Sequence, residues 1–423
     1  MRADLARLNH VLLPATKSGR DRYRNGRIAR RLRHITWIFA RLTWEGRILL
    51  AAVFAAMLFA ANIVRTQSHV LVLITGSLLF ASLSFTRAYR LKGVTAELRS
   101  PARVTVGDEI TIHVSLRNEG NTAHRALRIE QPLLPWDGSW AAPQSMIASL
   151  APGGRASAQA RARFVARGEH HMDPFRVVAL LPLGLSQGAP VRTEGLRFVV
   201  VPRVARVTSI VTPRNRRHQP GGVARASRTG DATDLLGVRP YRPGDPVRDL
   251  HARLWARHGV PVVREYQEEY FARIGVGVDS DTRFATPSHL EAALSLAAGV
   301  IATLCRSEAL VDLLVMGESL QRLSLGRSLG SLDQALDVLA AVQPGHAFSA
   351  DSVLAQLGPH LEQLSSVVLI FLSWNAARAA LASAIRARGV GCAVLIVGDH
   401  ASREPYGTTV PLDSIVNGEE LSL

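Results

Sequence analysis

Two long apolar runs near the amino terminus constrain the fold more than any other feature of this chain. Residues 48–64 and 70–85 contain no charged side chain, and only Arg65-Thr-Gln-Ser-His69 separates them. Each run is close to the shortest length that crosses a bilayer as a helix. Two buried helices of a soluble core could have the same composition. The short connection and the basic flanks favour a transmembrane helical hairpin over residues 46–86.

The basic residues around these runs predict how the hairpin is oriented. The chain has 50 Lys and Arg against 34 Asp and Glu, and many of the Arg residues lie in a basic tail, residues 1–45. Four more basic residues follow the hairpin within residues 87–99, whereas its connection contains only Arg65. Cationic flanks stay on the cytoplasmic side, so both termini and the soluble domains are expected in the cytoplasm. Trp37 and Trp44 precede the first run, where aromatic side chains anchor at the interface.

Residues 93–206 have the pattern of a β-sandwich. Short segments of alternating polarity, such as Ile110–Leu116 and Leu196–Val201, are separated by turn clusters such as Asn118-Glu-Gly-Asn121. Regular short strands with turn residues between them are typical of this architecture. His170, His171 and Asp173 could suggest a metal site, but adjacent residues of a strand point to opposite faces. We therefore expect no shared metal ion there.

The next two segments differ sharply in composition. Residues 207–235 are rich in Arg, Gly and Pro and are interpreted as a linker. Residues 236–272 combine charge, proline and glycine between strand-like apolar runs. Such a segment suits a surface of fixed shape that meets a partner. Its Arg and acidic residues are expected to pair with one another.

Residues 273–400 alternate apolar strand-like runs with Ala-rich helical segments, which predicts an open parallel α/β sheet. Ligands of such sheets bind beyond the carboxyl ends of the strands. Here that edge is expected to contain Asp279-Ser-Asp-Thr-Arg283, the Gly317-Glu318 turn and Ser373-Trp-Asn375. Residues 401–423 are interpreted as a C-terminal tail. The two cysteines, Cys305 and Cys392, are far apart in apolar surroundings and are expected to be buried thiols of a reducing compartment.

The segment Arg239-Pro-Tyr-Arg-Pro-Gly-Asp245, with Arg248, Arg257 and Arg264-Glu265 after it, resembles the motif of the DUF58 family. The order of hairpin, sandwich, motif and α/β domain resembles that family over nearly the whole chain. The resemblance implies a von Willebrand factor A-like α/β domain. It also implies a place in the bacterial inner membrane as partner of a MoxR-type AAA+ ATPase and of other membrane proteins of its operon. The motif residues that it assigns to partner binding are Arg239, Tyr241, Pro243, Gly244, Asp245, Arg248, Arg257, Arg264 and Glu265.

The chain departs from the family pattern at two places. Leu250-His251-Ala252 stands where an Ile-Asp-Trp-like triplet is usual. The metal site of A-type domains, Asp-x-Ser-x-Ser, is reduced to Asp279 and Asp281, with Arg283 in place of the second serine. An arginine cannot ligate a cation and repels it. We therefore expect no cofactor, with Asp279 and Asp281 as the residues that would hold Mg²⁺ if the degenerate site bound an ion. Otherwise these carboxylates cap the next helix or pair with Arg283.

The residues favour a non-enzymatic adaptor that acts by protein–protein interaction. One alternative is a metal-dependent hydrolase built on Asp231, Asp234, Asp245, Asp249, His251 and His258. Their spacing matches no catalytic motif. A second alternative is a membrane-associated nucleic-acid-binding protein, given the Arg runs, but the aromatic residues of a single-strand platform are missing. We expect membrane lipid, and no nucleic acid, among the partners.

Overall fold

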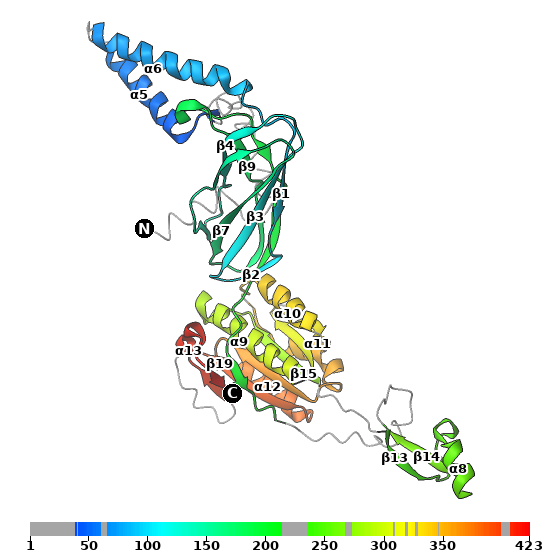
Figure 1. The fold of residues 1–423 in the computed structure, drawn as a ribbon. Helices are drawn as coiled ribbons and strands as arrows, with labels where there is room; N and C mark the ends of the chain where they lie inside the picture. The colour runs from blue at the N-terminus through cyan, green and yellow to red at the C-terminus, as the bar shows by residue number, and fades with distance from the viewer. Residues whose placement is uncertain are drawn as a thin grey trace. The chain divides into compact units, whose positions relative to one another are not determined.

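The computed structural model describes residues 39, 41–60, 66–213, 235–266, 273–307, 309–317, 320–325, 329–345, 347–398 and 407–423. The chain divides into two compact units, Met1–Pro202 and Arg203–Leu423. Each unit is described by itself (Figure 1). Trp37, most of the basic tail and the hairpin connection lie outside the described residues.

Two apolar helices open the first unit. They are α5 (Trp44–Ala60) and α6 (Thr66–Ser84), and the turn η1 (Phe85–Arg87) follows. Their large side chains are exposed, for example Phe54 at 65%, Leu73 at 70% and Phe80 at 74%. His69–Arg87 is long and apolar enough to cross a membrane. Pro287–Arg306 passes the same test, but it is mostly buried in the second unit and is a core helix.

Short strands around one apolar core form the rest of the first unit. Residues 110, 112, 114 and 116 of β3 are each at most 1% exposed, because alternate residues of a strand point to the same face. The alternating pattern therefore predicted the strands correctly. One sheet has the order β1 (Val94–Arg99), β3 (Glu109–Asn118), β7 (Arg155–Phe164), β5 (Gly138–Trp140). A second has the order β10 (Val191–Arg192), β9 (Arg176–Ala179), β4 (His124–Glu130), β6 (Met146–Leu150). A third has the order β2 (Arg103–Thr105), β11 (Leu196–Val201), β8 (Gly168–Met172).

The base of the hairpin is bonded to the loop that follows β9. Thr43 N donates to Leu185 O at 3.1 Å and Gln187 N donates to Arg41 O at 2.8 Å. The hydroxyls of Ser82 and Ser186 share a buried hydrogen bond. Leu42, with 0% exposure, packs at this junction. The two helices are therefore fixed to the strand-rich part by contacts at the beginning of α5 and near the end of α6.

A six-stranded sheet covered by helices forms the centre of the second unit. Helix α9 begins directly after Thr286, with Pro287 at its first position, where the missing N–H costs no hydrogen bond. The helices are α9 (Pro287–Arg306), α10 (Leu329–Ala341), α11 (Ala350–Leu361) and α12 (Ala376–Ala387). The strand order is β17 (Leu320–Leu325), β16 (Leu310–Met316), β15 (Arg273–Asp279), β18 (Ser366–Phe371), β19 (Gly391–Val397), β20 (Gly407–Val410).

The expectation of a wholly parallel sheet was wrong at one edge. Strand β17 pairs with β16 antiparallel, with Met316 opposite Leu320, while the other pairs are parallel. Only residues 317–319 connect the two strands. A parallel partner would require a crossover of roughly a dozen residues, so this connection allows only a hairpin. The observed class is mixed α/β.

The end of the chain belongs to the second unit and is not a tail. Strand β20 extends the six-stranded sheet, and α13 (Leu412–Asn417) follows it. Strand β21 (Leu421–Ser422) pairs in parallel with β12 (Val207–Ser209), at the start of the expected linker. Strands β12 and β21 have only three and two residues, too few to show an alternating polarity pattern. Their pairing therefore depends on a partner that is distant in the sequence.

The motif segment folds locally as a two-stranded ribbon with a short helix. Strands β13 (Leu235–Pro240) and β14 (Val262–Tyr266) pair antiparallel. Between them lie the turn η3 (Val247–Asp249) and helix α8 (Ala252–His258). We call residues 235–266 the motif arm.

Candidate functional site

A bidentate ion pair closes the turn of the motif arm. Arg239 Nη1 and Nη2 donate to the two carboxylate oxygens of Asp245 at 2.7 and 2.9 Å, and Arg242 N donates to the same carboxylate at 2.8 Å. Gly244 has φ 104°, a conformation that favours glycine. The hydrogen bonds from Arg239 and from the Arg242 backbone lower the pKa of Asp245 to about 2. Asp245 therefore organises the turn as a carboxylate, and the predicted Arg–acid pairing is present here.

The remaining motif residues build the frame around this turn. Tyr241 N donates to Pro261 O at 2.9 Å, which extends the ribbon beyond Pro240. Arg264 lies opposite Val238 in the register, and Glu265 lies opposite Gly237. Pro243 is exposed in the turn. The frame is therefore fixed largely by main-chain bonds and the Arg239–Asp245 pair.

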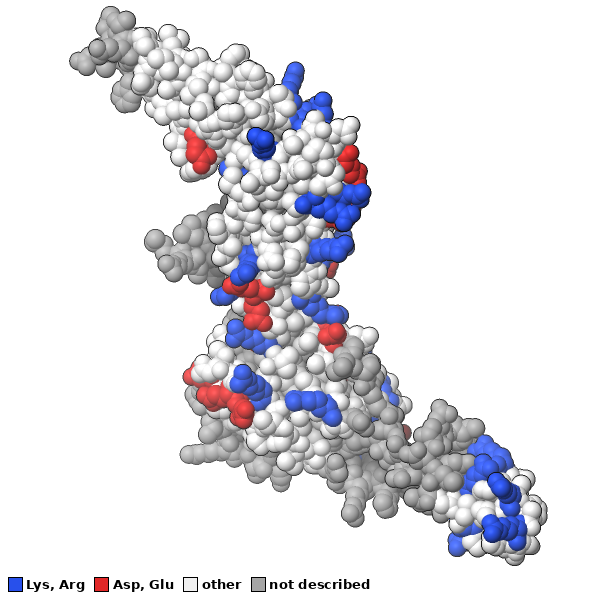
Figure 2. All heavy atoms as spheres, in the orientation of Figure 1, with Lys and Arg blue, Asp and Glu red and all other residues white. Residues whose placement is uncertain are grey.

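Helix α8 presents a basic and partly aromatic surface. His251 Nδ1 accepts from Leu254 N at 3.3 Å and caps the helix, and Gly259 at φ 69° ends it. Arg253, Arg257 and Trp255 are exposed on it, Trp255 at 43%. Residues 239–264 contain six Arg and two Asp, so positive charge exceeds negative charge in this segment. Figure 2 shows Lys and Arg gathered on the visible face of this segment.

Most of these cations remain at the surface. Arg248 lies 3.9 Å from Asp249, a weak pairing, and its side chain is 53% exposed. Arg242 and Arg264 are also exposed. Exposed apolar side chains accompany them, with Val247 at 74% and Val260 at 55%. The arm thus offers a cationic surface with apolar patches, which suits an acidic protein surface.

A second charged cluster lies at the carboxyl end of β15. Asp279, Asp281 and Arg378 are each 0% exposed. Arg378 Nε donates to Asp279 Oδ2 at 2.7 Å, and its Nη2 lies 2.6 Å from the same oxygen and 3.4 Å from Asp281 Oδ2. Arg283 donates to the two oxygens of Asp281 at 2.9 and 2.8 Å. We call these four residues the carboxylate cluster.

The carboxylate cluster does not fit a divalent cation. The Arg378 guanidinium lies between the two carboxylates, where a cation would have to bind, and the Phe348 ring lies 4.9 Å from it. Burial raises the pKa of Asp279 against the opposing charge of Arg378. Burial acts in the same direction on Asp281, but the hydrogen bonds from Arg283 outweigh it and hold the pKa of Asp281 below its usual value. Neither carboxylate caps the next helix, since Thr286 occupies that position.

Sequence reasoning missed Arg378, although the sequence contains a signal for it. Asn375 caps α12, so Arg378 lies in the first turn, where the helix dipole disfavours a cation. It also shares the buried face of the helix with Leu381, Ala382 and Ile385 at helical spacing. An arginine on an apolar stripe at a helix start indicates a buried acidic partner, but it does not tell which of the buried acids, among them Asp279, Asp281 and Asp312, that partner is.

The residues of the hydrolase alternative do not meet in one cluster within the described part of the chain. Asp245 is bonded to Arg239 and His251 caps α8. Asp231 and Asp234 lie outside the described residues. No group of three His, Cys, Asp or Glu side chains among the described residues could hold a metal ion.

His170 and His171 of the first unit lie on opposite sides of strand β8. His170 is buried, and its Nε2 lies 2.6 Å from Asp137 Oδ2. His171 lies on the other side of β8, with its Nε2 at 3.8 Å from Asp173. The two histidines thus have different acidic neighbours, as expected from strand geometry.

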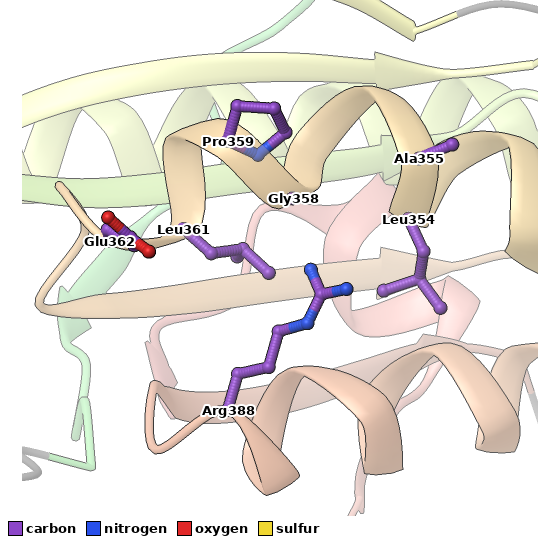
Figure 3. Close-up of a pocket in the computed structure, with 7 residues that line it drawn as sticks. All are labelled: Leu354, Ala355, Gly358, Pro359, Leu361, Glu362 and Arg388. Atoms are coloured by element: carbon purple, nitrogen blue, oxygen red, sulfur yellow. The ribbon is translucent and has the colours of Figure 1, made fainter.

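A surface groove of about 500 Å³ lies between α11 and α12. Leu354, Gly358, Leu361 and Glu362 line it from α11 and the residue after it (Figure 3). Arg388 reaches across from the end of α12, and a Cβ on Gly358 would lie 2.9 Å from its Nη1. The groove lies at the opposite end of α12 from Arg378, so it is not part of the carboxylate cluster.

Comparisons with known proteins give no family for this chain. No family model matches it, and no curated protein matches it. Part of alpha-2-macroglobulin from Escherichia coli is 16% identical with a TM-score of 0.21, over 28% of this chain and 20% of that chain. The CARDB domain of the PF1109 protein from Pyrococcus furiosus is 14% identical with a TM-score of 0.18, over 25% of this chain and 91% of that chain.

A third solved structure is proximal thread matrix protein 1 from the mussel byssus. It is 11% identical with a TM-score of 0.28, over 35% of this chain and 46% of that chain. The chain thus spans about a fifth of the alpha-2-macroglobulin structure and less than half of the mussel protein. Likenesses of this size carry no argument about function.

Proposed function

We propose that this protein is a membrane-anchored adaptor that acts by protein–protein interaction, as partner of a MoxR-type AAA+ ATPase. The apolar hairpin would anchor it in the bacterial inner membrane, with both termini and the soluble domains in the cytoplasm. The α/β part would be a von Willebrand factor A-like domain of the DUF58 type. These assignments rest on the resemblance of the motif residues and on the exposed apolar surface of α5 and α6.

The motif arm is the observation that carries the proposal. It has 32 described residues, and Val262 and Val263 are its buried valines. So small a module buries too little apolar surface to be stable by itself. Its basic face, with exposed Trp255, is suited to a partner that supplies acidic and apolar surface.

The chemistry of the arm supports binding more than catalysis. Asp245 and His251 are bonded to groups that shape the turn and the helix. A general base or metal ligand needs a free lone pair directed at a substrate. The lone pair of His251 Nδ1 already accepts a main-chain N–H, and three hydrogen bonds within the turn hold the carboxylate of Asp245 in place.

A binding experiment with the purified ATPase tests the proposal. The full-length chain in detergent is immobilised, and retention of a purified MoxR-type AAA+ ATPase is measured at low and at physiological salt. Replacing Arg253 and Arg257 by Gln should reduce retention roughly tenfold, since exposed cations mainly set steering and complementarity. Asp245→Ala should also weaken capture, because the turn loses its ion pair.

The matched control exchanges Arg192 and Arg197 of the strand-rich part for Gln, which changes the net charge equally. Unchanged ATPase retention in both arm variants contradicts the proposal. Hydrolytic turnover that disappears in Asp245→Ala supports the hydrolase alternative. Salt-dependent RNA or DNA binding lost with Arg253 and Arg257 supports the nucleic-acid alternative.

A further inference from the structure

The turn η2 (Pro182–Gly184) displays a large apolar side chain from a strained backbone. Leu183 has φ 73° and ψ −6°, in the left-handed region, and it is 71% exposed. A left-handed conformation is unfavourable for any residue with a Cβ. Gly184, the next residue, also has a positive φ of 66°. Exposure alone would need no explanation, but a strained backbone that holds the exposed side chain in place is a feature often found at functional contacts.

This turn is held at the base of the apolar hairpin. Thr43, the residue before α5, donates through its hydroxyl to Gly184 O, and its N–H donates to Leu185 O at 3.1 Å. Ser186 bonds to Ser82 near the end of α6. Leu183 is therefore one to three residues from the contacts with Thr43 before α5 and with Ser82 of α6, at the end where the helices meet the strands (Figure 1).

Exposed aromatic side chains occur at the same end of the hairpin. Trp44 begins α5 and is 68% exposed, and Phe85 directly follows α6 and is 62% exposed. Tyr89 is 37% exposed, and its carbonyl lies against Gly188. Amphipathic aromatics concentrate where a span leaves the hydrocarbon layer. Trp44 and Tyr89 match this pattern. Phe85 and Leu183 add exposed apolar surface at the same end of the hairpin, and we call Trp44, Phe85 and Leu183 the apolar collar.

Cationic side chains accompany the collar. Arg87, Arg90 and Lys92 are exposed just after α6. Burial, and next to it the charge of Arg90, lower the pKa of Arg41. Figure 2 shows basic residues where the hairpin meets the strands and none on the visible face of the hairpin above them. This charge complements anionic lipid head groups.

We propose that Leu183 is a third membrane contact, which enters the interfacial layer of the bilayer beside the two helices and seats the strand-rich part against the lipid surface. The inference rests on the proposed function, because it requires the hairpin to lie in the membrane. Lipid is the occupant that the surroundings favour, since the turn is continuous with an uncovered apolar hairpin and is bordered by cations. A single leucine offers too small an apolar area for a stable protein contact.

Lipid quenching of a fluorescent label tests this proposal. In the full-length chain Cys305 and Cys392 are replaced by Ser, and single cysteines are placed at Leu183, Ile74 or Val165. Each variant is labelled with a polarity-sensitive dye and reconstituted into vesicles of phosphatidylcholine and phosphatidylglycerol in equal parts, with shallow or deep doxyl lipids. Val165 is the matched control, because it is 61% exposed and follows the far end of the β3–β7 ladder.

The dye at position 183 should be quenched by shallow doxyl lipid roughly twofold more than the dye at position 165, with a blue-shifted emission. The dye at Ile74, in the middle of α6, should be quenched by deep doxyl lipid. Quenching at 74 with none at 183 overturns this inference and leaves the membrane anchor intact. No quenching at 74 overturns both the anchor and the inference.

A second measurement needs no cysteine substitution and no label. Hydrogen exchange of the native chain in nanodiscs should be slower over residues 181–185 than over residues 132–136, which contain the equally exposed Leu133. The variant Leu183→Gly relieves the backbone strain and removes the side chain, so it folds and should lose the protection. Equal protection in wild type and Leu183→Gly contradicts a role for the leucine side chain.

Discussion

Arg378 determines the character of the carboxylate cluster at the scale of single residues. Its guanidinium is fully buried and contacts both Asp279 and Asp281. A buried charge is tolerated only with close, opposite partners. Arg378 lies between the two carboxylates, and Arg283, which donates to both oxygens of Asp281, supplies the second positive charge that balances them. The edge of the sheet has a cation of its own and needs no external ion to be stable.

Arg378→Met should leave Asp279 buried without its counter-ion, while Asp281 keeps the pair with Arg283. We expect a loss of about 3–5 kcal/mol in the free energy of unfolding, as for other broken buried pairs. Magnesium should raise the melting temperature of the variant, because carboxylate oxygens are ligands for it. It should leave the wild-type melting temperature unchanged.

The matched control for this prediction is Arg322→Met. Arg322 bonds to the buried Asp312, but Arg273 donates to both oxygens of the same carboxylate at 3.0 and 3.1 Å. The loss should be smaller, and magnesium should have no effect. A wild-type melting temperature that rises with magnesium and falls with chelator would contradict the metal-independent interpretation.

Asp245 should make the motif arm sensitive to acid. Hydrogen bonds from Arg239 and the Arg242 backbone lower its pKa from 3.8 to about 2. A carboxyl whose pKa is lowered by folding stabilises the fold above its unfolded pKa, and this contribution is lost as the pH falls through the folded pKa. Hydrogen exchange over residues 237–264, corrected for the intrinsic rate, should therefore accelerate between about pH 4 and about pH 2. In Asp245→Asn exchange should already be fast at neutral pH and change little over that range.

At the scale of secondary-structure elements, the apolar hairpin packs against the 180–187 loop at positions where only glycine fits. Gly46, in the first turn of α5, is buried, and a Cβ built on it would overlap the carbonyl oxygen of Leu185. Gly188 stands in the same relation to the carbonyl of Tyr89. These close main-chain approaches fix the base of the hairpin against the loop that displays Leu183. They require residues without a Cβ at both positions.

Gly46→Ala should separate α5 from this loop and cost about 1–3 kcal/mol through overpacking. The measurement is thermal unfolding of the detergent-solubilised chain, combined with protease sensitivity of the 180–187 loop. Gly76→Ala in α6 is the control, since nothing lies within 4 Å of its Cβ position. It should be neutral or slightly stabilising, because Ala has the higher helix propensity. Equal effects of the two substitutions would show that the junction is not tightly packed.

Orientation in the membrane is the question at the scale of the whole molecule. The Arg-rich segments on both sides of the apolar runs predict a cytoplasmic location for the strand-rich part of the first unit and for the second unit. Trypsin added to intact spheroplasts should leave the carboxyl half of the chain undigested, and trypsin added after lysis should cleave it. An antibody against residues 407–423 reports the result. Digestion from outside would reverse the proposed topology and remove the cytoplasmic ATPase from the reach of the motif arm.

Much of the element content could be predicted because local periodicity determines it. Alternation over residues 110–116 predicted β3, and the Thr286-Pro287 start predicted α9. The strand pairs β16–β17 and β12–β21 could not be predicted in this way. Strand β21 has two residues, and its partner lies more than 200 positions earlier. The pairing of such short strands depends on the lengths of the connecting loops and on which sheet edges still have unpaired main-chain groups.

The same distinction between local pattern and long-range contact applies to the candidate site. The sequence by itself determined the composition of the motif arm, the apolar hairpin and the presence of two aspartates after a buried strand, because spacing and residue type are local properties. Only the tertiary structure decided that Arg378, about a hundred positions from Asp279, would lie between those aspartates, and that Gly184, next to Leu183, would bond to Thr43. Contacts between residues so distant in sequence arise from packing, which no local pattern encodes.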